Sequence, residues 1–119
     1  MKALPIYRDA LALAAALVDA LDRRTAFPQL AERIVRGALT VLDAVTLAKA
    51  GIERQRQLQR ADASLAGLRA AIELAHAVGL LPVEFALDLA ARADSIGRQL
   101  GGWQRRGVTG SLQAAPAEC

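Results

Sequence analysis

The sequence predicts an all-α fold, an antiparallel up-down-up-down four-helix bundle, on three observations. Apolar residues make up 54% of the 119-residue chain and aromatic residues only 3%, so alanine and leucine supply most of the apolar volume. Both residues favour helices, whereas residues typical of strands are scarce. Four segments repeat apolar residues every three or four positions, which places each set on one helix face. Because the connections are short, consecutive helices are expected to pack antiparallel.

The first two helices are predicted over residues 4–22 and 28–52. The apolar stripe of the first consists of Ile6, Ala10, Leu13, Leu17 and Leu21. The stripe of the second consists of Leu30, Ile34, Ala38, Val41, Val45, Ala48 and Ile52. Pro28 suits a helix start, where the missing N–H is not needed, and Gly51 near the end leaves the boundary open.

The third and fourth helices are predicted over residues 56–78 and 82–103. The stripe of the third consists of Leu58, Ala61, Leu65, Leu68, Ile72 and Ala75. The stripe of the fourth consists of Ala86, Leu89, Ala93, Ile96, Leu100 and Trp103. Pro82 fits a helix start, and Gly79 is placed to close the third helix in a left-handed cap.

The chain is expected to form one domain over residues 1–106, followed by a disordered tail over 107–119. The tail lacks periodicity and is rich in glycine, serine, alanine and proline. A repeat of two helical hairpins is the alternative, but no sequence repeat supports it. No segment approaches the roughly 20 apolar residues of a membrane span. Charged residues on both sides of residues 10–18 argue against a signal peptide.

No catalytic, metal or cofactor site is predicted, so the chain is not expected to be an enzyme. His76 is the only histidine and Cys119 the only cysteine, and the glycines form no phosphate-binding loop. Carboxylates occur singly on helices, as in solvated faces or ion pairs. The single cysteine permits no disulfide within the chain and indicates a reducing compartment, so a cytoplasmic location is expected.

Two helices carry a second apolar stripe, which favours self-association. The stripe on the first helix consists of Leu11, Ala14 and Val18, and that on the second of Val35, Leu39, Leu42 and Thr46. A helix that is apolar over more than one face buries more than one face. Either the core is wide or another subunit covers the patch, and we favour the second explanation.

The charge is segregated along the chain, whose formal net charge is +3. Residues 49–60 hold four basic residues and one acidic residue, as do residues 92–106, whereas residues 61–91 hold one basic and four acidic residues. In the predicted topology the ends of the second and fourth helices meet the starts of the first and third. Nine of the fifteen basic residues then gather toward one pole: Lys2, Arg8, Lys49, Arg54, Arg56, Arg60, Arg98, Arg105 and Arg106.

This pole is the predicted nucleic-acid-binding site, with phosphates as the main contact. The candidate residues are Lys49, Arg54, Arg56, Arg60, Arg98, Arg105 and Arg106. The helix macrodipole explains Lys49, Arg105 and Arg106 without a ligand, but it disfavours Arg56 and Arg60 in the first turns of a helix. A solvated basic face and an acidic protein partner remain as alternatives. Because aromatics are few, stacking on bases is not expected.

Two stretches resemble the accessory variability determinant (Avd) proteins of diversity-generating retroelements. Residues 61–69, ADASLAGLR, resemble the start of the third Avd helix, and residues 96–103, IGRQLGGW, resemble the end of the fourth. The opening LPIY at residues 4–7 is similar to the wider four-helix-bundle superfamily that includes the 23S rRNA intervening-sequence proteins. The second-helix signature of that latter group is missing at residues 45–51, VTLAKAG, which favours Avd. The resemblance spans residues 4–106.

The resemblance implies properties that composition and periodicity do not address. An Avd protein is a homopentamer of four-helix bundles with a basic surface. It associates with a reverse transcriptase and with RNA or an RNA–DNA hybrid, and it supports mutagenic retrohoming without catalysing a reaction itself. By the same resemblance, Trp103 is a packing anchor at the end of the fourth helix. An intervening-sequence-type protein and a plain oligomeric protein-interaction module are the alternatives.

Overall fold

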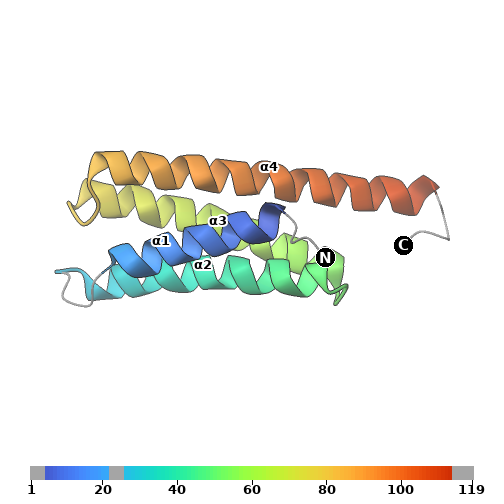
Figure 1. Ribbon diagram of the computed structural model, residues 1–119, viewed down its shortest axis with the longest axis horizontal. Helices are drawn as coiled ribbons and strands as arrows, with labels where there is room; N and C mark the ends of the chain where they lie inside the picture. Colours follow the sequence, from blue (N-terminus) through green and yellow to red (C-terminus); the bar gives the residue numbers. More distant parts are fainter. Residues whose placement is uncertain (1–4, 22–25, 114–119) are drawn as a thin grey trace.

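The chain folds into four α-helices, and the described residues contain no strand (Figure 1). The computed structural model describes residues 5–21 and 26–113, with side chains as far as residue 106. The helices are α1 (Pro5–Ala20), α2 (Pro28–Lys49), α3 (Arg54–Ala77) and α4 (Val83–Gln113). The prediction of an all-α, four-helix fold is therefore confirmed.

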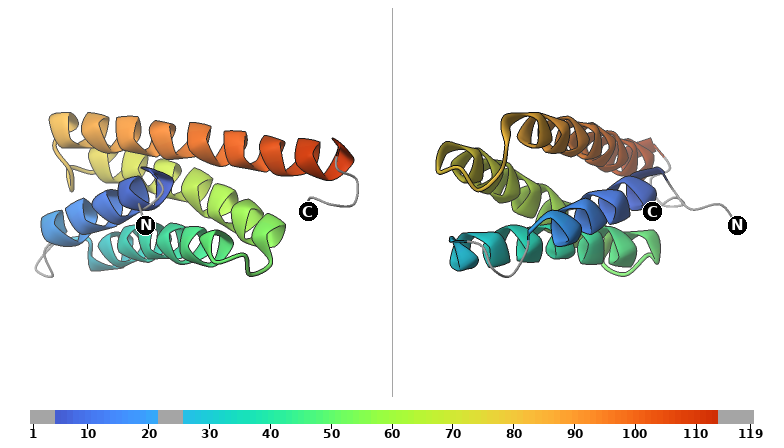
Figure 2. Two further views of the ribbon diagram at one scale, coloured as in Figure 1. Left: turned by 45° about the vertical axis from the view of Figure 1, so that its right-hand side comes forward. Right: turned by 60° about the vertical axis from the view of Figure 1, so that its left-hand side comes forward.

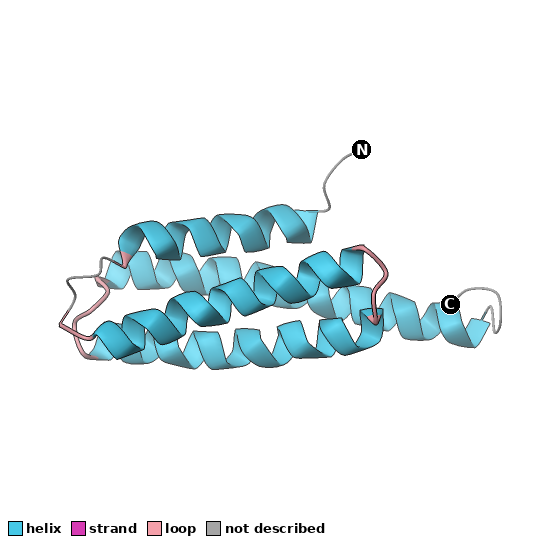
Figure 3. Ribbon diagram, turned by 90° about the horizontal axis from the view of Figure 1, so that it is seen from below, coloured by secondary structure: helices cyan, strands magenta, loops and turns pink. Residues whose placement is uncertain are grey.

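Each helix contacts two of the others, and together they enclose one core. Helix α2 lies against α1 and α3, whereas α4 lies against α3 and α1, and the α2–α3 contact is the most extensive (Figure 2). The molecule is elongated, at 53 × 23 × 22 Å. The loop between α2 and α3 and the loop between α3 and α4 lie at opposite ends of the bundle, and α4 continues past the first of them (Figures 1 and 3).

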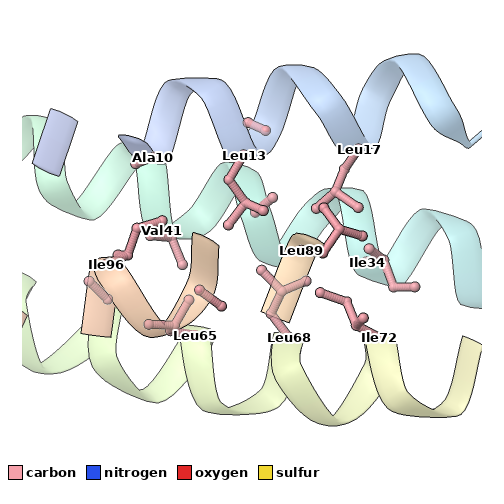
Figure 4. Close-up of a cluster of buried hydrophobic side chains, with 14 of the residues drawn as sticks. Ala10, Leu13, Leu17, Ile34, Val41, Leu65, Leu68, Ile72, Leu89 and Ile96 are labelled. Atoms are coloured by element: carbon pink, nitrogen blue, oxygen red, sulfur yellow. The ribbon is translucent and has the colours of Figure 1, made fainter. Parts of the chain in front are cut away.

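The core consists of alanine, leucine, isoleucine and valine side chains from all four helices, and Figure 4 shows part of this cluster pointing inward. Nearly all of the predicted stripe residues are buried or packed against this core. Ile52 is the exception, because its side chain is 51% exposed. The reason is that α2 ends at Lys49, so Ile52 lies in the following turn rather than on the helix face.

Two glycines end helices in the left-handed conformation. Gly51 has φ +83°, and the Ile52 and Gly51 amides donate to the carbonyls of Leu47 and Ala48 at 2.9 and 3.0 Å. Gly79, at φ +84°, is followed by the matching bond from the Leu80 amide to the Ala75 carbonyl at 2.8 Å. Both patterns are Schellman motifs, which satisfy the last carbonyls of a helix. The predicted cap at Gly79 is confirmed, and Gly51 fixes the boundary that the sequence leaves open.

Helix α4 is longer than predicted. It continues to Gln113, whereas the sequence pattern ends the helix at Trp103 and assigns residues 107–119 to a disordered tail. The prediction of a disordered tail is therefore corrected for residues 107–113, which are helical. Residues 114–119 lie outside the described residues. No proline interrupts the segment from Val83 to Gln113, so each glycine costs only about 1 kcal/mol of helix propensity. In Figure 3, α4 extends beyond the loop that joins α2 and α3.

The second apolar stripes are divided between core and surface. Ala14 belongs to the buried core, and Val35 and Leu42 are partly buried against it. The large side chains that remain exposed are Leu11, Val18 and Leu39. Part of the second stripe therefore widens the core, and part of it leaves an apolar surface on α1 and α2.

Candidate nucleic-acid interface

Four of the predicted basic residues surround one hollow near the end of the molecule where α2 meets α3. We call this feature, of roughly 440 Å³, the basic hollow. Its lining residues come from all four helices: Pro5, Ile6, Lys49, Arg54, Arg98, Gln99, Gly102, Trp103 and Arg106. Four of them are cationic and none is a carboxylate. The hollow is therefore a concentrated positive site with an apolar wall formed by Ile6 and Trp103.

Arg54, the first residue of α3, links three helices at the basic hollow. Its Nε donates to the carbonyl oxygen of Ala48, near the C-terminus of α2, at 3.1 Å. Its guanidinium carbon lies 5.7 Å from the centre of the Trp103 ring on α4, within the range of a cation–π contact. The positive start of α3 disfavours a cation, but the negative C-terminal end of α2 offsets this effect. The Nη groups of Arg54 make no hydrogen bond to another described residue.

Lys49, the last residue of α2, is held at the hollow by two favourable interactions. Its ammonium lies 4.6 Å from the centre of the Tyr7 ring on α1. It also complements the negative end of the α2 macrodipole. The side chain is half-buried, so its charge is less screened by water than that of a fully exposed lysine.

Arg98 and Arg106 supply the cations of α4 that line the hollow. Both are exposed, and neither makes an ion pair or hydrogen bond to another described residue. Gly102 lies between them, and a Cβ there would be 3.4 Å from Nη1 of Arg106. The glycine therefore leaves room for this guanidinium beside the helix. The sequence pattern gives no reason for that glycine, but the hollow does.

The other three predicted residues do not line the hollow. The Arg56 side chain is 77% exposed and lies 3.6 Å from Glu53, whereas Nη1 of Arg60 donates to Gln57 at 2.9 Å. Arg105 folds back along α4, so that its Nη1 lies 3.3 Å from where a Gly101 Cβ would be. The predicted set thus divides into four residues that line the hollow and three that do not. Lys2, which also belongs to the predicted basic cluster, lies outside the described residues.

Carboxylates near the hollow are few and engaged. Asp9 on α1 accepts a hydrogen bond of 2.6 Å from Nε2 of Gln99, a lining residue, and Glu53 pairs with Arg56. The other ion pairs among the described residues join Arg36 to Glu32, Arg69 to Asp94 and Arg92 to Asp88. Gln99 is neutral, so Asp9 keeps its negative charge beside the hollow, whose described lining residues include four cations and no carboxylate.

Sequence reasoning missed Tyr7 and Gln99 as parts of this site and treated Trp103 only as a packing residue. Trp103 is partly buried against the core, as expected, but it also lies beneath Arg54. Tyr7 stands one residue after the buried Ile6, at the start of α1. The predicted proximity of the α1 start and the α2 end was the available signal for the Lys49–Tyr7 contact.

A second hollow, of roughly 610 Å³, lies between α3 and α4, and we call it the apolar groove. Its lining residues are Ala66, Arg69, Ala70, Ile72, Glu73, His76, Val83, Ala86, Leu87, Ala90 and Asp94. Leu87 is 65% exposed and Val83 is 48% exposed, although both are large apolar residues. The Arg69–Asp94 ion pair joins the two helices at this groove. His76 is exposed, and its Nδ1 lies 3.3 Å from the Leu81 carbonyl oxygen.

Neither hollow has the composition of a metal site. Among the described residues, no three histidine, cysteine, aspartate or glutamate side chains are grouped so that they could hold a metal ion. Cys119 lies outside this part of the chain. No helix in the same part is long and apolar enough to cross a membrane.

Comparisons with protein-family models, with curated proteins and with solved structures find no match to this chain. The function is therefore argued from the basic hollow, the apolar groove and the residues around them.

Proposed function

We propose that this chain is a non-catalytic basic adaptor that binds RNA or an RNA–DNA hybrid beside a reverse transcriptase. The single observation that carries the proposal is the convergence of Lys49, Arg54, Arg98 and Arg106 from three helices on one hollow without a carboxylate. Basic side chains that lie close together, despite their mutual repulsion and their loss of hydration, are typical of phosphate-binding sites. The reverse-transcriptase partner, the cytoplasmic location and the role in mutagenic retrohoming rest on the Avd resemblance of residues 61–69 and 96–103.

The proposal includes an antiparallel up-down-up-down topology, because that topology brings the basic segments to one end. The positions of the loops in Figure 1 and the contacts of α1 with α2 and α4 support it. In this arrangement the ends of α2 and α4 share one pole with the starts of α1 and α3. The charge segregation of the sequence then becomes a segregation in space.

Binding would depend on phosphates rather than on base identity. Arginine presents several donors in a planar fork that fits phosphate oxygens. The two aromatic residues nearest to the hollow, Tyr7 and Trp103, are already engaged by Lys49 and Arg54. Their rings are therefore poorly placed to stack on bases, and we expect little dependence on nucleotide sequence.

Self-association is part of the same proposal. Leu11, Val18 and Leu39 are exposed on α1 and α2, and Val83 and Leu87 are exposed beside the apolar groove. Exposed apolar surface of this kind is typical of interaction sites. We propose a homopentamer, as the Avd resemblance implies. Light scattering should give about 63 kDa, five times the 12.6 kDa chain mass, and a 12.6 kDa monomer would contradict this part.

A plain protein-interaction module is the second candidate, and the apolar groove favours it. In that case the groove holds a partner helix and the basic pole contacts an acidic protein surface. A 23S rRNA intervening-sequence-type protein is a further form of this candidate, with the same fold and without the reverse transcriptase. Such a module would self-associate but would bind RNA only weakly.

The deciding experiment is binding to a structured RNA across a salt series. Each phosphate that the protein neutralises adds to the slope with which log affinity falls against log salt, so contact with several phosphates predicts a steep loss of affinity between low and high salt. Binding that weakens in this way supports the adaptor. Absence of binding at low salt would favour the protein-interaction module.

A further inference from the structure

We propose that the basic hollow seats a terminal phosphate monoester of a nucleic-acid strand, in preference to the phosphodiesters within the strand. The inference rests on the proposed nucleic-acid binding and identifies which group of the nucleic acid the hollow takes. It is based on the arrangement of the seven predicted basic residues, of which four converge and three do not.

The positive charge is concentrated rather than extended. A protein that follows a strand along its backbone needs a track of cations that each meet one phosphate. Here one hollow is lined by Lys49, Arg54, Arg98 and Arg106. Arg56 and Arg60 instead contact Glu53 and Gln57, which are close to them in the sequence. Four cations around one space match a single group of high charge better than a row of singly charged groups.

A terminal phosphate is the group on a strand with the highest charge. A phosphate monoester carries about −1.5 to −2 charges at pH 7 and three acceptor oxygens. An internal phosphodiester carries one charge. The gain in electrostatic attraction on replacing a phosphodiester by a phosphate monoester is largest where several cations act on the same oxygens.

The donors for such a group are available in the hollow. Arg98 and Arg106 make no ion pair or hydrogen bond to the rest of the described chain, and the Nη groups of Arg54 also lack such a partner. The Nε bond of Arg54 to Ala48 fixes that side chain in advance. The ordering of Arg54 therefore costs less when the ligand binds, because part of it is complete in the free protein.

The size of the hollow also admits a strand end. Its volume of roughly 440 Å³ lies in the range of about 300–1,000 Å³ that holds a small ligand, so a phosphate can enter with the nucleoside attached to it. Ile6 and the partly buried Trp103 form an apolar wall, which reduces the screening of the cations by water.

The test compares three RNA oligonucleotides of one sequence, with a 5′-phosphate, a 3′-phosphate or hydroxyl groups at both ends. Binding to the full chain is measured by fluorescence anisotropy with a label inside the strand. We expect one phosphorylated strand to bind at least about tenfold more tightly than the hydroxyl-ended strand, the effect of one additional charge-assisted hydrogen bond. The two phosphorylated strands show which end the hollow takes.

Two double variants locate the effect. The variant Arg98→Gln with Arg106→Gln should bind the three strands with nearly equal affinity, because both residues are exposed and line the hollow. The matched control, Arg56→Gln with Arg60→Gln, should keep the preference. Circular dichroism verifies that both variants are folded.

Three results would overturn the inference. Equal affinity of the wild-type chain for all three strands would overturn the terminal-phosphate site and leave the proposed nucleic-acid binding intact. A preference that persists in the Arg98→Gln, Arg106→Gln variant would overturn the assignment to the hollow. No binding of any strand at low salt would overturn the proposed function and this inference together.

Discussion

The basic hollow and the apolar groove are surface features of one small bundle, but they are built from different kinds of residues. The hollow gathers four cations from three helices, whereas the groove is lined by seven apolar residues of α3 and α4 together with Arg69, Glu73, His76 and Asp94. In the hollow, Arg54 is held by Ala48 and Trp103. In the groove, Leu87 remains exposed with no packing role in the core. Under the proposed function, the comparison predicts that phosphate binding and protein binding use separate surfaces.

The largest expected effect distinguishes the groove from the core beneath it. Leu89 is fully buried and Leu87 is 65% exposed, although they are two residues apart on α4. Leu89→Ala should lower the free energy of unfolding by about 3 kcal/mol, as large-to-small core substitutions do. Leu87→Ala should change it by less than about 0.5 kcal/mol. Urea denaturation of both variants measures this difference, and a similar loss in both would make the groove residue part of the core.

A smaller effect is expected at the residue that organises the hollow. Arg54→Ala removes the hydrogen bond to Ala48 and the contact with Trp103, so it should cost about 1–2 kcal/mol of stability. Arg56→Ala removes only an exposed ion pair and should cost less than about 0.5 kcal/mol. Equal denaturation midpoints for the two variants would mean that Arg54 is not held in place as described.

The smallest expected effect concerns Glu53, a carboxylate that pairs with the predicted basic residue Arg56. Glu53→Gln removes a negative charge next to Arg54, which lines the hollow, so RNA affinity should rise about two- to threefold, which corresponds to an exposed charge interaction of ~0.5 kcal/mol. Glu53 has φ +48°, and glutamine places a similar demand on the backbone. Anisotropy at low salt measures the change, and a decrease would show that Glu53 supports binding instead of opposing it.

The sequence was sufficient to predict the core of each helix, because burial follows a period of three and four residues. Leu58, Leu68, Leu89 and Ile96 are buried as their spacing predicts. Helix ends were less predictable. Gly51 stops α2 before Ile52, and α4 continues past Trp103, because local capping and the absence of proline decide these boundaries rather than periodicity.

The basic cluster was predicted only as a group. Charge segregation indicated which segments meet, but it could not distinguish Arg98 and Arg106, which line the hollow, from Arg56 and Arg60, which do not. That distinction depends on the direction of each side chain on its helix and on partners such as Gln57. Neither is encoded in the number of charges along the chain.

The most direct test compares the salt dependence of RNA binding between two double variants. Arg98→Gln with Arg106→Gln should reduce the slope of log affinity against log salt, because two of the four cations that neutralise phosphate charge at the hollow are lost. Arg56→Gln with Arg60→Gln should leave the slope unchanged. Equal reductions in both variants, or none in the first, would contradict the conclusion that the basic hollow is the phosphate-binding site.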